Sequence, residues 1–241
     1  MSPSSTREVF HRRFARCALL VALIAFSLSA AAAQPGNRRH PALDSIGARS
    51  FTATGMPGDP LNIAFIGSES QLLRLMADAH WEPADPITLR SSMRIAIDSV
   101  ARRPYVDAPV SSLYVNGKKQ DFAFEQPAAG NPSKRHHVRF WRVDLLDALG
   151  RPLWIGAATY DMSVGLSHVN HHVTHHIAAD IDSERDKLLD DARATGRVTT
   201  HWIDDFQSAR SGHNGGGDPF HTDGRLAVIV SVEPSASSQT P

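Results

Sequence analysis

Histidine is the side chain that this sequence supplies most densely for chemistry near neutral pH, and five of its 13 histidines fall within nine residues. Asp161 precedes this histidine-rich segment, and Asp180 and Asp182 follow it. Imidazole moves protons near neutrality and also binds divalent metals, so the segment is the first candidate for a functional site. The five histidines are His168, His171, His172, His175 and His176.

Geometry restricts a metal site built from neighbouring histidines alone. On a strand, His172 and His176 share a face but lie roughly 13 Å apart, whereas zinc ligands sit about 2.0–2.1 Å from the ion. A helix would allow the pair to chelate, but Val173, Thr174 and Ile177 favour a strand. A divalent metal would therefore need acids from other elements, and the alternative is a set of neutral histidines hydrogen-bonded across a sheet. The candidate metal ligands are His175, His176, Asp180 and Asp182.

Several hydrolase motifs are absent from the sequence. There is no G-x-S-x-G motif, and the single H-x-T at residues 172–174 has no second copy. Arg135-His136 resembles the start of a histidine-phosphatase motif, but His137 stands where glycine is expected. What remains is a combination of histidines and arginines, which can bind a phosphate or carboxylate and transfer a proton.

Two runs on either side of a Gly-Arg-Pro turn are expected to position these side chains as an antiparallel strand pair, residues 135–143 and 153–161. On the first run, period two places His136 on one face and His137 with Arg139 on the other. Both faces carry polar and aromatic groups, so the sequence leaves open which one is covered.

A helix is expected directly after the histidines. Its apolar stripe includes Arg185, while Glu184 is expected to face water. A guanidinium that faces a core needs a carboxylate, and Asp182 and Asp161 are the nearest candidates. The stripe consists of Ile181, Arg185, Leu188, Leu189 and Ala192.

The rest of the chain predicts an α+β fold, with one domain over residues 58–233, a mainly antiparallel mixed sheet and about three helices. Ser68 is expected to cap the first helix, and a second begins at Thr88 or Ser91. Asn116-Gly117 is typical of a hairpin turn and is expected to pair the strand at 109–115 with the strand at 121–125. The other expected elements are strands at 61–66, 109–115, 121–125, 197–206 and 225–232, and a mobile loop at 212–217.

The N-terminus predicts export. Arginines precede an apolar run that ends in small residues, which is typical of a signal peptide over residues 1–33; an uncleaved inner-membrane signal anchor is the alternative. Residues 34–57 are expected to be a flexible linker and 234–241 a disordered tail. Cleavage would remove four arginines, one glutamate and the only cysteine, leaving 21 basic and 24 acidic side chains. The mature protein would then be periplasmic or extracellular and would contain no disulfide. A nucleic-acid binder would need a basic surplus.

Four motifs give the chain a family resemblance. They are RHHVRFW (135–141), WIGAATYD (154–161), THHIAADIDSERDKLL (174–189) and TDGR (222–225), and with them the chain, from about Pro60 to about Val232, resembles the LssY C-terminal domain family. The resemblance implies a soluble module that in relatives often follows membrane segments of the DedA type or of the type 2 phosphatidic acid phosphatase. It assigns no reaction.

The recurrent polar positions of that family supply the candidate residues. His168, His171, His172 and the loop 212–218 are particular to this chain. Catalytic candidates are His136, His137, Arg139, Asp161, His175, His176 and Arg185, and ligand-binding candidates are Arg135, Asp223 and Arg225.

Two functions follow from these residues. The first is an envelope hydrolase, or a binder, of an anionic, phosphate-bearing and lipid-linked ligand, with the membrane or its proteins as partners. The second is a non-catalytic accessory or interaction module whose histidines, arginines and aspartates form a structural network. In the first case His136, Asp161, His175 and Arg185 should converge on an open pocket with space for a ligand. In the second they should pair with each other and leave no such pocket.

Overall fold

Two long strands, β8 (Arg135–Leu146) and β9 (Pro152–Leu166), form the centre of the fold. They are antiparallel neighbours, and their register places His137 opposite Thr159. Asp147 closes the turn between them, because its Oδ1 accepts two backbone hydrogen bonds of 2.9 Å. The expected strand pair is therefore confirmed, and each strand extends beyond its predicted end.

The structure is a computed structural model of the chain. From His40 onward the chain forms one compact unit. The second expected helix, from Thr88 or Ser91, falls outside the described part, as do the predicted signal peptide and C-terminal tail. The described residues are 39–84, 112–128, 134–169 and 173–232.

Within the described chain, β8 and β9 belong to an eight-stranded sheet of order β11-β14-β3-β9-β8-β7-β4, with β10 paired to the last part of β9. β14 and β3 are parallel, and the other neighbours are antiparallel. The remaining strands are β3 (Ile63–Ile66), β4 (Glu82–Pro83), β7 (Phe122–Pro127), β10 (Val173–Ile177), β11 (Val198–Ile203) and β14 (Leu226–Ser231).

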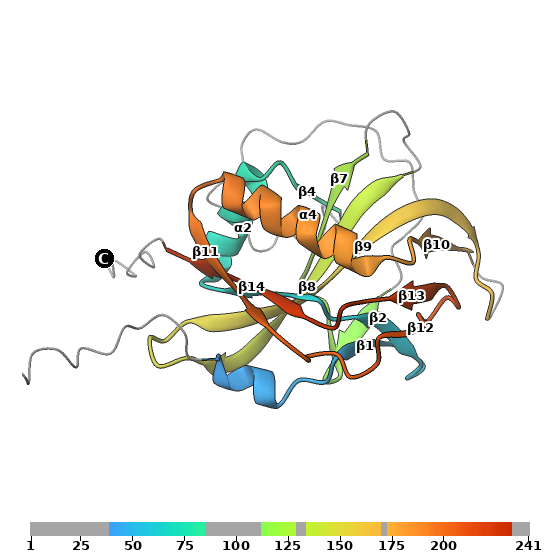
Figure 1. Cartoon of the computed structure of the whole chain (residues 1–241), viewed down its shortest axis with the longest axis horizontal. Coiled ribbons are helices and arrows are strands. Elements are labelled where there is room, and N and C mark those ends of the chain that lie inside the picture. The colour runs from blue at the N-terminus through green and yellow to red at the C-terminus, as the bar shows by residue number, and fades with distance from the viewer. Residues whose placement is uncertain (1–38, 85–111, 129–133, 170–172, 233–241) are drawn as a thin grey trace, which may run out of the picture. The chain divides into compact units, whose positions relative to one another are not determined.

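Two helices, α2 (Glu69–Asp78) and α4 (Ile181–Ala194), pack on one face of this sheet (Figure 1). The α2 helix begins with the expected capping box, in which Ser68 and Gln71 satisfy each other's backbone N–H groups. The carboxylate of Asp180 caps α4 by accepting hydrogen bonds from the backbone N–H groups of Asp182 and Ser183. The core under the helices includes Ile63, Phe65, Leu72, Met76, Phe140, Trp154, Leu188 and Leu189.

The opposite face is covered by a second, smaller sheet of order β2-β1-β5-β6 and by a 3-10 helix, η1. Trp141 and Ile155 of the large sheet pack there with Leu113 and Leu43. This second core explains why both faces of β8 and β9 carry apolar residues. The bounds are η1 (Pro41–Asp44), β1 (Arg49–Thr52), β2 (Pro57–Pro60), β5 (Leu113–Val115) and β6 (Lys118–Lys119).

A short hairpin of β12 (Ser211–His213) and β13 (Pro219–His221) lies near β10 at the end of the large sheet (Figure 1). The backbone N–H of His168 donates to Gly216 O in the hairpin turn at 2.9 Å. The segment expected to be a mobile loop is thus hydrogen-bonded to the chain that follows β9.

The predicted α+β class with one mainly antiparallel sheet and about three helices is wrong. The described chain is mostly β, with two α-helices and several sheets. The second sheet was missed because part of it, β1, lies in the stretch 34–57, whose glycines and prolines predicted a linker. Short strands that pair only with distant segments leave little periodicity in the sequence.

Two further expectations change. The turn at Asn116-Gly117 exists, but it joins β5 to β6, and β7 pairs with β8 in the large sheet instead of returning along β5. Glu184 is buried at the start of α4 instead of facing water, because His136 on β8 hydrogen bonds to it. No helix in the described part of the chain is long and apolar enough to cross a membrane.

Candidate functional site

Polar side chains gather on one face of the β8–β9 pair, the face that carries Trp141 further along β8. Their register sets Arg135 opposite Asp161 and His137 opposite Thr159, so these four side chains share a face. His137, Thr159 and Asp161 are buried. The face is therefore apolar under the small sheet and polar toward the end of the large one.

Asp161 lies at the centre of this polar end. One of its oxygens lies 2.9 Å from His175 Nδ1 and 3.3 Å from Arg135 Nε. Arg135 also donates to Glu125 at 2.9 Å, and its Nη2 lies 2.8 and 2.9 Å from the two ring nitrogens of His175. We call Glu125, Arg135, Asp161 and His175 the acid–histidine cluster; they come from β7, β8, β9 and β10.

The two carboxyl groups of this cluster differ in pKa. Burial alone would raise the pKa of Asp161, but the hydrogen bond from His175 and nearby positive groups hold it below its ordinary value. Burial raises the pKa of Glu125 above its ordinary value, and Arg135 only partly offsets that effect. Asp161 thus stays ionised more readily than Glu125 does.

His137 lies beside the cluster and has no hydrogen-bond partner for either ring nitrogen among the described residues. Burial, followed by the charge of Arg139, lowers its pKa to about 3, so the ring is neutral. In the same region Thr159 Oγ1 and Arg139 Nε are also buried without partners in the described chain. Buried polar atoms of this kind are usually satisfied by water, an ion or a ligand.

A second carboxylate group lies deeper along the same face. Arg139 Nη1 donates to Asp59 Oδ2 at 3.0 Å, and burial raises the pKa of Asp59. Asn214 Nδ2 lies 3.5 Å from both Asp59 and Asp218. These contacts lead from the β8–β9 pair to the turn between β12 and β13.

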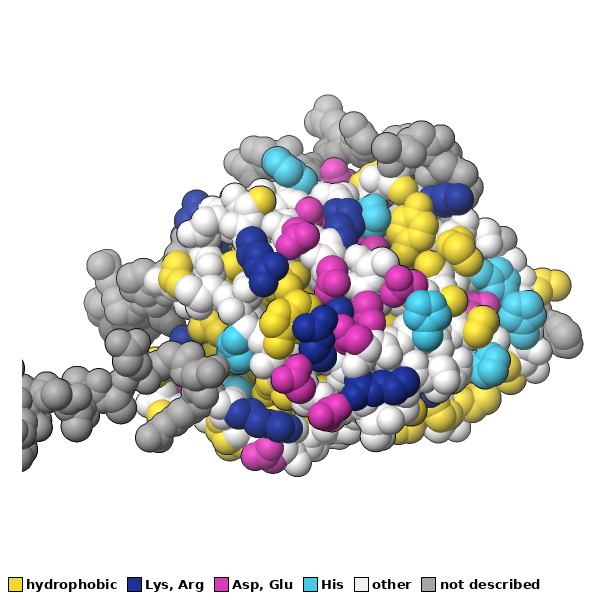
Figure 2. Space-filling view, viewed as in Figure 1, with side chains coloured by type: hydrophobic (Ala, Val, Ile, Leu, Met, Phe, Trp, Pro, Cys, Tyr) yellow, Lys and Arg dark blue, Asp and Glu magenta, His cyan; other side chains and the backbone are white. Residues whose placement is uncertain are grey.

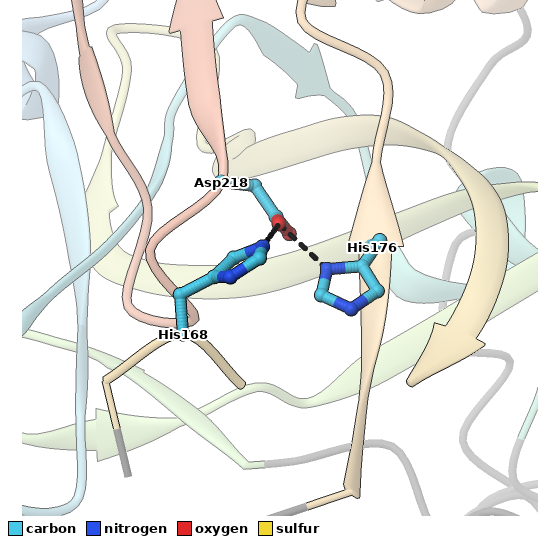
Figure 3. A group of neighbouring side chains, drawn as sticks. All are labelled: His168, His176 and Asp218. Atoms are coloured by element: carbon cyan, nitrogen blue, oxygen red, sulfur yellow. Dashed lines mark hydrogen bonds and ion pairs between the residues drawn. The ribbon is translucent and has the colours of Figure 1, made fainter. Parts of the chain in front are cut away.

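At that turn Asp218 stands between two histidines (Figure 3). His176 Nδ1 lies 2.7 Å from Asp218 Oδ1, and His168 Nε2 lies 3.6 Å from the same oxygen. Figure 2 shows histidine side chains gathered on this part of the surface, over β10, β12 and β13. His168, His176 and Asp218 are called the histidine triad below.

His136 lies on the helix-covered face of the sheet, away from the acid–histidine cluster. Its Nδ1 is 2.7 Å from Glu184 Oε2, and its ring packs against Tyr160 at 4.9 Å between centroids. Burial raises the pKa of Glu184, although the contact with His136 opposes the change. This pair fastens α4 to β8.

Arg185 belongs to a third group, at the junction of α4 with the segment before β14. It makes a two-pronged contact with Asp223, at 2.7 and 3.1 Å, and donates to Asp186 at 2.8 Å. The Trp202 ring lies between Arg185 and Arg225, 4.7 and 4.4 Å from their guanidinium carbons. These contacts join α4 to the segment before β14 and to β11.

The structure thus divides the predicted site residues among several places. Arg135, His137, Arg139, Asp161 and His175 lie together, and His176 bonds to Asp218 nearby. The four predicted metal ligands do not converge, because Asp180 caps α4 and Asp182 bonds to Thr222 and Arg185. The candidates placed elsewhere are His136, Arg185, Asp223 and Arg225.

Sequence reasoning missed the acids that complete these groups. Glu125 could have been found from register, since it lies opposite His137 on β7. Asp59 and Asp218 carried no signal, because each lies next to proline in a segment whose pairing depends on distant strands. His168 was noted in the sequence, but only the hairpin turn shows what it meets.

Fold and site together define a mostly β domain that buries a histidine, arginine and carboxylate cluster at one end of its large sheet. The chain belongs to the LssY C-terminus family, whose profile matches residues 43–226. The family inferred from the four motifs is thereby confirmed. Comparison with curated proteins and with solved structures gave no match.

Proposed function

We propose that this protein hydrolyses an anionic, phosphate-bearing ligand of the cell envelope at the acid–histidine cluster. The observation that carries the proposal is the opposite pKa shift of Glu125 and Asp161, which lie on either side of Arg135. The raised pKa suits Glu125 to give a proton, and the lowered pKa keeps Asp161 ionised, so that it can hold the imidazole of His175 as the base.

Arg135 is the group that would hold the phosphate. Its guanidinium can donate two parallel hydrogen bonds to an oxyanion, and its side chain is partly exposed. Its present partner, Glu125, becomes neutral more readily than an ordinary glutamate, and a neutral Glu125 frees part of the guanidinium for an incoming anion. The ring nitrogens of His137 and the hydroxyl of Thr159, which have no partner within the described part of the chain, lie along the same face and offer further contacts to ligand or water.

The proton transfers follow from the same contacts. Asp161 holds Nδ1 of His175. Arg135 Nη2 lies 2.9 Å from Nε2, and once the guanidinium turns to the phosphate, Nε2 takes a proton from a water molecule. The water oxygen bonds to phosphorus as the bond from phosphorus to the leaving oxygen breaks. Protonated Glu125 gives its proton to that leaving oxygen, and the products are an alcohol and a phosphate with one more hydroxyl.

The envelope location and the lipid-linked nature of the ligand come from outside the site. The first rests on the signal peptide expected over residues 1–33. The second rests on the membrane and phosphatase segments that are fused to this module in the relatives that the chain resembles. These fused segments are an analogy and describe no residue of the site itself.

The test is turnover of phosphate monoesters, phosphate diesters and lipid phosphates by the purified protein, with and without divalent metals. His175→Gln and Glu125→Gln should each lower kcat by about 10²- to 10⁴-fold, the range for a lost general base or acid. His221→Ala, an exposed histidine outside the cluster, is the matched control and should keep full activity. Thermal unfolding of each variant establishes that it is folded.

Turnover that survives both glutamine substitutions would contradict these roles. Absence of turnover across the panel would favour a non-catalytic accessory module. That second function is supported by Arg185 and His136, which are paired with carboxylates as side chains of a structural network would be.

A further inference from the structure

The histidine triad has the composition and spacing of a metal site. His168 follows β9, His176 lies on β10 and Asp218 immediately precedes β13, so three separate segments supply one ligand atom each (Figure 3). The three ligand atoms all lie within 4.8 Å of one another. We propose that His168, His176 and Asp218 bind one divalent transition-metal ion of the zinc class.

The separations between these atoms fit such an ion. Ligands that sit about 2.0–2.2 Å from a tetrahedral zinc are roughly 3.3 Å apart. The two distances to Asp218 Oδ1, 2.7 Å from His176 Nδ1 and 3.6 Å from His168 Nε2, lie on either side of that value. The side chain of His168 is 64% exposed, so a small rotation can bring its Nε2 into place.

The carboxylate of Asp218 is already oriented for this role. It is buried, its Oδ2 accepts a hydrogen bond from the backbone of Ile177 at 3.2 Å, and Asn214 Nδ2 lies 3.5 Å away. Asn214 Oδ1 in turn accepts from the backbone of Asp218 at 2.9 Å and of Gly216 at 3.0 Å. Metal-binding carboxylates are held by outer hydrogen bonds of this kind.

Two glycines make room for the histidines. A Cβ at Gly165 would lie 2.6 Å from His176 Nε2, so the imidazole occupies the space that any other side chain would fill. A Cβ at Gly217, whose φ is +87°, would lie 2.8 Å from the Cβ of His168. The ring of His176 therefore packs against the backbone at Gly165, which limits the positions that it can take, whereas at His168 only the Cβ is held close to Gly217 and the ring can still rotate.

The ligand chemistry selects the class of ion. Two neutral imidazoles and one carboxylate carry a single negative charge, and nitrogen donors favour zinc, copper, nickel and iron over calcium or magnesium. Three protein ligands leave a fourth position for water or an anionic oxygen, as in catalytic zinc sites. Binding of the ion itself can be measured without any turnover, so this proposal and the proposed hydrolysis can fail separately.

Isothermal titration of the chelator-treated protein with Zn²⁺ tests the proposal. We expect one tight Zn²⁺ site. Losing an outer hydrogen bond weakens metal affinity roughly 10- to 100-fold, and we expect His168→Ala and Asp218→Asn each to weaken the affinity for Zn²⁺ by more than that. Asn214→Ala removes only an outer partner and should fall within that range. His213→Ala and His221→Ala change exposed histidines of the same hairpin and should bind as the unchanged protein does.

Gly165→Ala tests whether the position of the His176 ring affects Zn²⁺ binding. It keeps all three ligands but should weaken Zn²⁺ binding, because the added methyl group displaces the ring. Titration with Co²⁺ gives a second readout, since a four-coordinate site absorbs in the visible range and Asp218→Asn should lose that band. The proposal is overturned if the protein does not bind Zn²⁺. It is also overturned if Asp218→Asn and His168→Ala bind Zn²⁺ as tightly as the unchanged protein, because the ion would then bind elsewhere on the histidine-rich surface.

Discussion

Replacing Arg185 by methionine should destabilise the fold without touching the acid–histidine cluster. The guanidinium is buried and hydrogen bonded to Asp223 and Asp186, and its removal leaves Asp186 and Asp182 without this cation, while Asp223 keeps only its contact with Arg225. Breaking a fully buried ion pair costs about 3–5 kcal/mol. Because Asp223 is 34% and Asp186 51% exposed, water partly replaces the lost contacts, and we expect a loss of about 2 to 3 kcal/mol.

The loss should depend on pH. Burial alone would raise the pKa of Asp223, but hydrogen bonds from Arg185 and Arg225 hold it well below its ordinary value. A carboxyl group with a lowered pKa in the folded state stabilises the fold above its unfolded pKa of about 3.9, and this contribution disappears as the pH falls. The difference between the two proteins should therefore be full above about pH 5 and shrink below about pH 4.

Urea unfolding followed by tryptophan fluorescence measures this difference at each pH. Arg193→Met is the matched control, since Arg193 lies on the same helix with an exposed side chain and should cost less than about 0.5 kcal/mol. Equal losses for the two variants, or a loss for Arg185→Met that does not change with pH, would refute the reasoning. A stable Arg185→Met protein that no longer turns over a substrate would instead place Arg185 in the site.

Two other variants probe buried polar groups. The pKa of His137 is lowered to about 3 in the folded protein. Below about pH 6.5 the unfolded chain therefore binds a proton at His137 that the folded chain does not. As the pH falls from about 6.5 to 3, the free energy of unfolding should drop by up to about 1.4 kcal/mol per pH unit. His137→Gln should flatten that slope in urea unfolding, and unchanged slopes would contradict the assignment. Asn62→Ala should cost about 3 kcal/mol or more, because Asn62 bonds to both backbone groups of Ala158 and to Ile181 O. A loss below about 1 kcal/mol would mean that water replaces those bonds.

Elements with a strong local signal could be predicted from the sequence. The α2 helix has a capping box next to an apolar stripe, and the β8–β9 pair has a tight turn between two apolar runs. The burial of Arg185 followed from helical spacing alone. In each case the evidence lies within one continuous stretch of sequence, so no knowledge of distant segments is needed.

The partners of these elements could not be predicted in the same way. Of the two acids predicted to pair with Arg185, Asp182 does so at 3.1 Å, whereas Asp161 bonds to Arg135 and His175 instead. The two-pronged partner, Asp223, comes from 38 residues away and was not predicted. Glu184 appeared to face water because helical spacing does not show that His136 lies above it. The small sheet depends on pairing between β1 and β5, whose sequences are far apart.

The register of β8 against β9 links the core of the fold to its chemistry. On the face that packs against the small sheet, the side chains of β8 change from apolar to charged toward the end of the large sheet. In that order they are Trp141, Arg139, His137 and Arg135. A slip of one residue would turn all of them to the helix-covered face and bring His136 in their place. The buried Trp141 end of this row therefore fixes where the charged end stands, and it does so without contacting the cluster.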